Sequence, residues 1–597
     1  MTLRLLIAGV GVSLLIGAGV TPWRLPADAL GPGVVAGVGD PAGIVTLGAA
    51  ELSMLPTPRL RIEGLSVRDP SGTLLLDVAT LSGALRIWPL LRGRLAFADL
   101  SLEAPRISVP QGGLEALARR IGWLLAPERE GTGDPGLTRL TVRDGEIGSG
   151  IDQASSVLAV LRRSPLSDAL ELSLAMSWRG HPVEVEVSRL DAVALLRGNP
   201  SSLQAALRMP FGAAQFEGRI AGGSAPVLDG TLDARAEDPD ALAAWLQLDL
   251  PVGLTGPAMV RTAIRAGAGG ASLSGLRLTL PQGAFDGVVT VQPLAGRLAV
   301  SGTLASDRVD LTAALRPWIP MRGSDGGWGR EPYDLAALPA GDLDLRVSAD
   351  RLLIGPASIT NAALTVIARN GRTDVALGNG TFHQGTVRGR IGFSAPGRAG
   401  VELRGQLAFE RVDAMSASAT LGMGRHLAGT ASGSLLFEGH GETPAALLRS
   451  LEGRTGLVIR QGEIQGVNLP EFLKRLERRP LPALPDLRGG RTPFDLASLQ
   501  GRISQGVVEL TEGSVSSPSM RIGFGGQIGL GERNFAVAGS VLPPGDPGRD
   551  WPFELSGTFD APLLLPDAGS LIRRAAAGAP LPFQAPLPLA VDAYAPR

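Results

Sequence analysis

Few side chains in this sequence are suited to catalysis or metal binding, and their spacing forms no recognised motif. The 597 residues include four histidines and no cysteine. The four histidines lack the H-x-x-x-H and H-E-x-x-H spacings that place two imidazoles on one helix face for zinc; they are His181, His383, His426 and His440. Without cysteine, disulfides, thiolate catalysis and cysteine-ligated metals are excluded. We therefore predict no metal site and no cofactor.

Nucleophilic serines and paired carboxylates give no stronger signal. No G-x-S-x-G sequence occurs, so the strand-to-helix turn that exposes a catalytic serine is not indicated. Acidic residues two positions apart do occur, such as Glu184 with Glu186 and Asp342 with Asp344. Alternate residues of a strand share a face, so a water-facing strand produces the same spacing. We predict that the protein is not an enzyme.

Charge and composition narrow the remaining classes. The chain carries 56 basic and 57 acidic residues, which gives no electrostatic reason to expect nucleic acid as a partner. It contains 81 glycines and 46 prolines together with 44% hydrophobic residues. That balance is typical of many short strands joined by turns.

Alternation of apolar and polar residues is the main structural signal. It predicts an antiparallel sheet with one apolar and one water-facing side, with hairpin turns at Asn370-Gly371 and Asn379-Gly380. The residues that we expect on the apolar side, as the lining of a groove, are Leu172, Leu174, Met176, Val183, Val185, Val187, Leu343, Leu345, Val347, Val401 and Leu403. Alternation alone leaves open whether this side lines a curled groove or packs against a second sheet.

The N-terminus carries a separate signal. From Leu5 to Val20 no residue is charged; with Trp23 the segment is roughly 19 residues, about 28 Å as a helix, which is enough to span a bilayer core. We expect a transmembrane anchor over residues 5–23. A cleaved signal peptide is the alternative, because Gly17, Ala18 and Gly19 are small enough for a peptidase site. Both interpretations place the chain from Arg24 onward outside the cytoplasm.

Two ordered sets of turn motifs indicate a family. The sequence Gly462-Glu463-Ile464-Gln465-Gly466-Val467-Asn468-Leu469 is followed by Thr492-Pro493-Phe494, and Pro89-Leu90-Leu91-Arg92-Gly93-Arg94-Leu95 is followed by Pro105-Arg106-Ile107. These resemble the C-terminal and N-terminal motifs of the AsmA family of bacterial envelope proteins. We interpret the second set as two strands joined by a tight turn at residues 92–94.

The resemblance implies five regions and a mainly β fold. We expect an anchor (1–23), an AsmA-like N-terminal domain (24–150), central β-groove repeats (151–430), an AsmA-like C-terminal domain (431–566) and a C-terminal helix and tail (567–597). The expected fold is a transmembrane helix followed by a long curled antiparallel β-sheet groove with a few short amphipathic helices.

The resemblance also implies a function without catalytic residues. It suggests a single-pass inner-membrane protein, with most of the chain in the periplasm, whose groove carries phospholipid acyl chains towards the outer membrane. Its expected partners are phospholipids, the inner membrane and outer-membrane or envelope proteins, and not nucleic acid. The alternative is an assembly factor or regulator of outer-membrane protein insertion that pairs with an exposed sheet edge.

Overall fold

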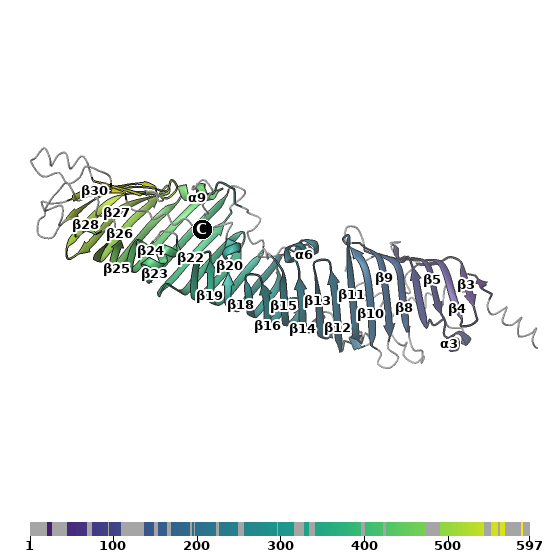
Figure 1. Cartoon of the computed structure of the whole chain (residues 1–597). Helices are drawn as coiled ribbons and strands as arrows, with labels where there is room; N and C mark the ends of the chain where they lie inside the picture. The colour runs from purple at the N-terminus through teal and green to yellow at the C-terminus, as the bar shows by residue number, and fades with distance from the viewer. Residues whose placement is uncertain are drawn as a thin grey trace, which may run out of the picture. The chain divides into compact units, whose positions relative to one another are not determined.

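The computed structural model is built almost entirely of β-strands (Figure 1). Its contacts divide the chain into unit 1, Met1–Leu248 with Leu254–Leu278, and unit 2, Asp249–Gly253 with Thr279–Arg597. The structure describes residues 21–26, 44–68, 74–92, 95–108, 137–148, 153–163, 169–191, 194–195, 198–222, 226–248, 256–294, 297–315, 328–333, 341–395, 400–421, 425–466, 468–469, 471, 490–542, 551–558, 562–566 and 587–588.

Unit 1 begins with short strands and continues as a regular meander. Strand β1 pairs with β3, and β2 and β3 both pair with β4. From β8 to β15 each strand pairs antiparallel with the next. The strands are β1 (Trp23–Leu25), β2 (Ile44–Leu47), β3 (Ala50–Ser53), β4 (Arg59–Arg68), β5 (Leu74–Ala84), β6 (Asp99–Glu103), β7 (Arg106–Ile107), β8 (Arg139–Ile147), β9 (Ala154–Arg163), β10 (Leu170–Trp178), β11 (His181–Leu190), β12 (Pro200–Met209), β13 (Gly212–Ala221), β14 (Val227–Ala236), β15 (Ala258–Gly267) and β16 (Gly270–Leu280), which crosses the border between the units.

Unit 2 repeats this arrangement with longer strands. Antiparallel pairs run in chain order from β19 to β32. The strands are β17 (Gly283–Leu294), β18 (Arg297–Asp310), β19 (Asp342–Ile354), β20 (Ala357–Arg369), β21 (Arg372–Phe382), β22 (Gly385–Ser394), β23 (Val401–Asp413), β24 (Leu427–Gly441), β25 (Glu452–Gln465), β26 (Arg491–Ser504), β27 (Val507–Ser517), β28 (Met520–Gly529), β29 (Asn534–Leu542), β30 (Trp551–Thr558), β31 (Pro562–Pro566) and β32 (Leu587–Pro588).

Short helices lie at the ends of strands. They are α3 (Ile87–Leu91), α6 (Pro239–Leu246), α7 (Thr312–Leu315), α8 (Ala414–Thr420) and α9 (Pro444–Arg449). Figure 1 shows α3, α6 and α9 beside strand termini and not across the middle of the sheet. The middle of the strands in each unit is therefore not covered by these three helices.

Two hairpin predictions have different outcomes. Asn370 and Gly371 form the turn between β20 and β21 with φ of 52° and 73°, the left-handed conformation that a type I′ turn requires at both central residues. Asn379 and Gly380 instead lie inside β21, at a register shift against β22. The second prediction is wrong because the extra residue forms a bulge and the strand continues.

The sheet is not antiparallel throughout, which corrects the prediction. Strands β6 and β7 pair parallel with β8, and β18 pairs parallel with β19. Parallel neighbours need a long connection that returns the chain to the same end of the sheet. Residues 108–138 and 311–341 make these connections, and alternation within strands does not reveal such returns.

The motif read as two strands around residues 92–94 is also corrected. Ile87–Leu91 form helix α3. This stretch is apolar without alternation, and Pro89 lies in the first turn of the helix, where no amide donor is needed. Leu90 packs against a buried cluster that includes Leu60 and Ile62.

Two predicted segments lie outside the described residues. They are the C-terminal helix expected after Asp567 and nearly all of the N-terminal anchor. Trp23, the last residue assigned to the anchor, belongs to strand β1. Within the described part of the chain, no helix has the length and apolarity needed to cross a bilayer.

Candidate functional site

The strands of unit 1 present one continuous apolar face. Cross-strand pairs place Leu174 opposite Val185, Val185 opposite Leu207, and Leu207 opposite Ala214. Directly opposed residues point to the same side of a sheet. The neighbouring row contains Leu161, Leu172, Val187, Ala205, Phe216 and Leu232. The side chains of these rows form a surface that extends from β9 to β14, which we call the apolar face of unit 1.

The apolar face of unit 2 is longer. One row can be followed strand by strand from β18 to β28, because each member pairs with the next. Its members are Gly302, Leu345, Val366, Val375, Ile391, Gly405, Phe437, Gly453, Ile503, Val508 and Ile528. The bulges in β21 and β27 do not interrupt the row.

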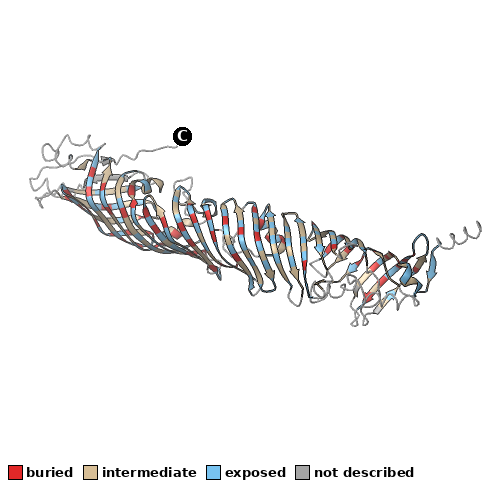
Figure 2. Ribbon diagram, turned by 90° about the horizontal axis from the view of Figure 1, so that it is seen from below, coloured by how far each residue is buried: buried red, intermediate tan, exposed pale blue. Residues whose placement is uncertain are grey.

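Burial differs along this face (Figure 2). Towards the C-terminus it is packed: Ile459, Phe494 and Met520 belong to one buried cluster that also contains Ala414 of α8. Between β20 and β24 it is open, since Ile391 and Leu407 are 39% and 37% exposed. The described strands contact chiefly their hydrogen-bonded neighbours, and none of them packs as a second sheet over this open part. The apolar face there is a surface and not a core.

The predicted lining residues fall on these faces in different states. Leu172, Leu174, Met176, Val185, Val187, Leu345 and Val347 are half-buried. Val183, Leu343 and Val401 are only 2–3% exposed, so they are core positions. Leu403 is half-buried but packs against the cluster that buries Val401.

Aromatic rings occupy the space above glycines on the apolar face. Phe437 is directly opposite Gly405, and a Cβ added at Gly405 would be 2.2 Å from Cζ of Phe437. The pairs Phe409 with Gly433, Phe494 with Gly462, Phe524 with Gly513, and Phe553 with Gly539 repeat this contact at 2.3–2.7 Å. Each glycine leaves space for the ring next to it, so the face has few tall protrusions.

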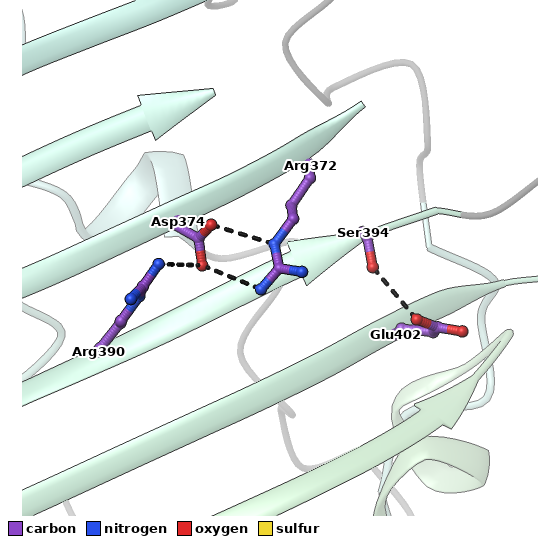
Figure 3. Close-up of polar contacts among 5 residues, drawn as sticks. All are labelled: Arg372, Asp374, Arg390, Ser394 and Glu402. Atoms are coloured by element: carbon purple, nitrogen blue, oxygen red, sulfur yellow. Dashed lines mark hydrogen bonds and ion pairs between the residues drawn. The ribbon is translucent and has the colours of Figure 1, made fainter. Parts of the chain in front are cut away.

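The opposite face of the same strands is polar. In unit 2, Asp374 accepts from Nε of Arg372 at 3.1 Å and pairs with Arg390 at 3.2 Å, while Ser394 Oγ donates to Glu402 at 3.4 Å (Figure 3). In unit 1, ion pairs join Arg208 to Glu184 and Arg261 to Asp233. Surface pairs of this kind contribute little stability. Their positions show which side of the sheet faces water.

Helix α6 closes one end of the apolar face of unit 1. Asp238 caps it by accepting from the amide of Ala241 at 2.9 Å. Buried Trp245 stacks edge-on against Trp178, with ring centroids 4.9 Å apart, and lies near His181. Trp178 and His181 continue the alternation of Met176 and Val183, so the aromatic cluster lies on the apolar side.

A segment of the long connection before β19 borders the apolar face of unit 2. Trp328 donates from Nε1 to the carbonyl of Leu530 at 2.7 Å, and the amide of Tyr333 donates to Glu442 O. Tyr333 packs with Val401 and with Leu447 of α9. Burial of its phenol raises the pKa of Tyr333 to about 12. This cluster explains why Val401 is inaccessible.

Among the described residues, no group of three His, Asp or Glu side chains is arranged to hold a metal ion. The described histidines have structural settings: His383 bonds Thr420 through Nε2 at 2.8 Å, and the His440 amide donates to Ser450 Oγ. What the geometry offers is therefore an extended apolar contact surface.

Residues 316–512 match the family model described as the AsmA family. Through this region the chain is similar to the AsmA family. The match begins between α7 and β19 and ends in β27, so it contains the open part of the apolar face of unit 2. It includes the C-terminal motif at residues 462–494, whereas the N-terminal motif at residues 89–107 lies outside it. No curated protein and no solved structure matches the chain.

The sequence analysis did not identify much of the apolar face of unit 2. Val366, Val375, Ile391, Leu407 and Leu435 complete the open part of unit 2. Alternation is broken beside two of them, since Ile367 follows Val366 and Leu436 follows Leu435, and both of these neighbours lie on the polar face. The bulge at Gly380 shifts the alternation by one residue, and only the pairing partner restores the side to which β21 residues point.

Proposed function

We propose that this AsmA-like protein is anchored in the inner membrane, extends into the periplasm and carries phospholipid acyl chains along its apolar faces towards the outer membrane. The observation that supports this most directly is the continuous apolar face of unit 2, which stays open between β20 and β24. A large exposed apolar patch is rare in proteins without a ligand or partner for it.

The chemistry of the face suits acyl chains. The rows traced above consist of aliphatic side chains, glycines and phenylalanine rings, and these rows contain no polar side chain that would select a particular ligand position. Each methylene removed from water contributes on the order of 0.8 kcal/mol without needing a hydrogen-bond partner. A chain can therefore be bound at many equivalent positions, and moving from one to the next breaks no directional bond.

Photo-crosslinking in living cells tests the proposal with adjacent residues on opposite faces. A photoreactive phenylalanine is placed at Leu345 or Leu407 on the apolar face, and at Arg346 or Gln406 on the polar face. We expect phospholipid adducts, detected by mass spectrometry of the full chain, at the first pair only. Equal adduct yields on both faces would refute a specific lipid surface.

A matched pair of charges then tests whether the face is continuous. Leu435 lies opposite Leu407 on the apolar face, and its neighbour Leu436 is 40% exposed on the polar face, opposite Arg454. If the carboxylate in Leu435→Glu excludes three or four methylenes, binding weakens by about 3 kcal/mol, roughly a hundredfold. The adduct at Leu407 should then disappear, whereas Leu436→Glu should leave it intact.

The same experiment separates the assembly-factor alternative. An assembly factor that pairs through a sheet edge should give adducts with outer-membrane proteins at edge strands and should tolerate Leu435→Glu. Protein adducts without lipid adducts would replace the transport proposal with that function.

A further inference from the structure

Helix α3 projects apolar side chains into solvent. Ile87, Trp88 and Leu91 are 58%, 74% and 71% exposed, among the highest values for large apolar residues in the described chain. Only its inward side is used, since Leu90 packs on the buried cluster of β4 and β5. The outward side of α3 is therefore an exposed apolar surface.

Other exposed apolar residues lie at the same end of the strands. Trp23 is 58% exposed and pairs across the sheet with Leu52. Leu52 in turn pairs with Leu60, and Leu60 pairs with Gly83. Gly83 precedes α3 by four residues, and three strand spacings separate its strand from β1, about 14 Å. Met54 and Leu55, which follow β3, are also exposed. We call Trp23, Met54, Leu55, Ile87, Trp88 and Leu91 the apolar tip.

Arginines flank the apolar tip. Arg86 and Arg92 border α3, Arg92 is exposed, and the side chain of Arg24 beside Trp23 is 89% exposed. Tryptophan favours the interface of a bilayer, where its ring is half immersed. Guanidinium groups bind lipid phosphates through paired hydrogen bonds. Apolar residues with a cationic border are the pattern of an element lying in a membrane interface.

The direction of the chain identifies which membrane. The uncharged run from Leu5 to Val20 ends three residues before β1 begins at Trp23. The apolar tip is thus at the end of the sheet where the chain arrives from its proposed membrane segment.

We propose that the apolar tip is seated in the headgroup region of the bilayer that holds the N-terminal segment, with Trp88 and Leu91 below the phosphates and the flanking arginines level with them. The proposal rests on the membrane anchor of the proposed function but not on lipid binding by the apolar faces. Docking fixes the N-terminal strands against the membrane, next to the source of lipid.

The absence of cysteine permits a clean test with the full chain. Single cysteines replace Trp88, Leu91 or, as a control, Arg68, which is exposed at the opposite end of β4, about 30 Å from Arg59 at 3.3 Å per residue. Each carries an environment-sensitive fluorophore, and the protein is reconstituted into phosphatidylcholine vesicles with phosphatidylglycerol and nitroxide-labelled acyl chains. We expect blue-shifted emission and nitroxide quenching at positions 88 and 91, and neither at 68.

Two results would overturn docking. One is water-like emission at 88 and 91, equal to that at 68; the other is a chain that fails to float with the vesicles. Protection at 88 in native membranes but not in vesicles would assign the tip to a protein partner instead. Because these labels report only the tip, a negative result leaves the crosslinking at Leu407 as an independent measure of the apolar face. Exchanging phosphatidylglycerol for neutral lipid should weaken quenching if the arginines contact phosphate-rich surface charge.

Discussion

Gly405 offers the sharpest test of how the apolar face is built. It lies in β23 directly beneath Phe437 of β24. In Gly405→Ala the new methyl carbon would be 2.2 Å from Cζ and 2.5 Å from Cε1 of the ring, well inside van der Waals contact. The ring cannot swing away freely, because Phe437 packs against the buried cluster of Leu451, Ile503 and Val508.

The magnitude follows from two opposing effects. Inserting a methyl group where no space exists costs about 1–3 kcal/mol. Replacing glycine reduces the freedom of the unfolded chain, which returns about 0.4–1 kcal/mol. Subtracting the midpoint of the second range, about 0.7 kcal/mol, from that of the first, about 2 kcal/mol, leaves about 1.3 kcal/mol. We therefore expect β23 and β24 to lose about 1–2 kcal/mol of local stability in Gly405→Ala.

Hydrogen exchange followed by mass spectrometry measures this locally. A chain with two units does not unfold in a single step, so a global melting curve gives no defined free energy, whereas amide exchange reports the opening of each segment. A loss of 1–2 kcal/mol should speed exchange about 5–30-fold in peptides from Val401–Asp413 and Leu427–Gly441.

Gly456 in β25 is the matched control. A Cβ added there meets no atom within 4 Å, so Gly456→Ala should slow exchange. Combining Gly405→Ala with Phe437→Leu should recover part of the loss, because the smaller side chain vacates the ring position. If Gly405→Ala exchanged as slowly as Gly456→Ala, the ring would not lie over the glycine and the account of a flat face would be wrong.

Three further outcomes are expected. Asp238→Ala removes the cap of α6 and should speed exchange in that helix by an amount equivalent to about 1 kcal/mol, while Asp238→Asn should not. Tyr333 keeps its proton above the ordinary pKa of 10, up to about 12; the folded state therefore holds the proton longer, and stability should fall as pH rises between these values. Tyr594 is the other tyrosine, so ultraviolet titration of Tyr594→Phe should show one late-titrating phenol, and titration near 10 would refute its burial. Trp328→Phe loses the bond to Leu530 and should expose residues 328–333 to limited proteolysis, with unchanged cleavage as the contrary result.

Period-two patterning predicted the strands and their sides well where the ladder is regular. Leu172, Leu174 and Met176 lie opposite Val187, Val185 and Val183 because a two-residue turn at Arg179 and Gly180 keeps the alternation in step. Patterning says nothing about what lies above a face. Val401 and Leu345 are both apolar residues in strands with alternating patterns, yet only Val401 is buried. The reason is that Tyr333 and Leu447, from distant parts of the chain, pack against Val401.

Sequence patterns could not predict the parallel strand pairs either, because these depend on contacts between distant parts of the chain. The parallel pairing of β18 with β19 depends on where the connection leads and not on the residues of either strand. Helix α3 was missed because its motif was interpreted through a family turn, although five apolar residues without alternation argue against a half-buried strand. A glycine in the middle of a strand is a sign that another group approaches closely. The phenylalanine that lies opposite each glycine can be identified only from the strand register.

The two-residue turns have a consequence for how such a protein can change its length. Each turn returns the chain with its alternation preserved, so adding or deleting a whole hairpin lengthens or shortens the sheet by two strand spacings, about 10 Å, and leaves every side chain on its original side. A single-residue insertion would instead exchange the sides along the rest of its strand unless a bulge absorbed it, as at Gly380. The length of a sheet can therefore change in steps of one hairpin, and the number of hairpins in a unit sets the length of its sheet.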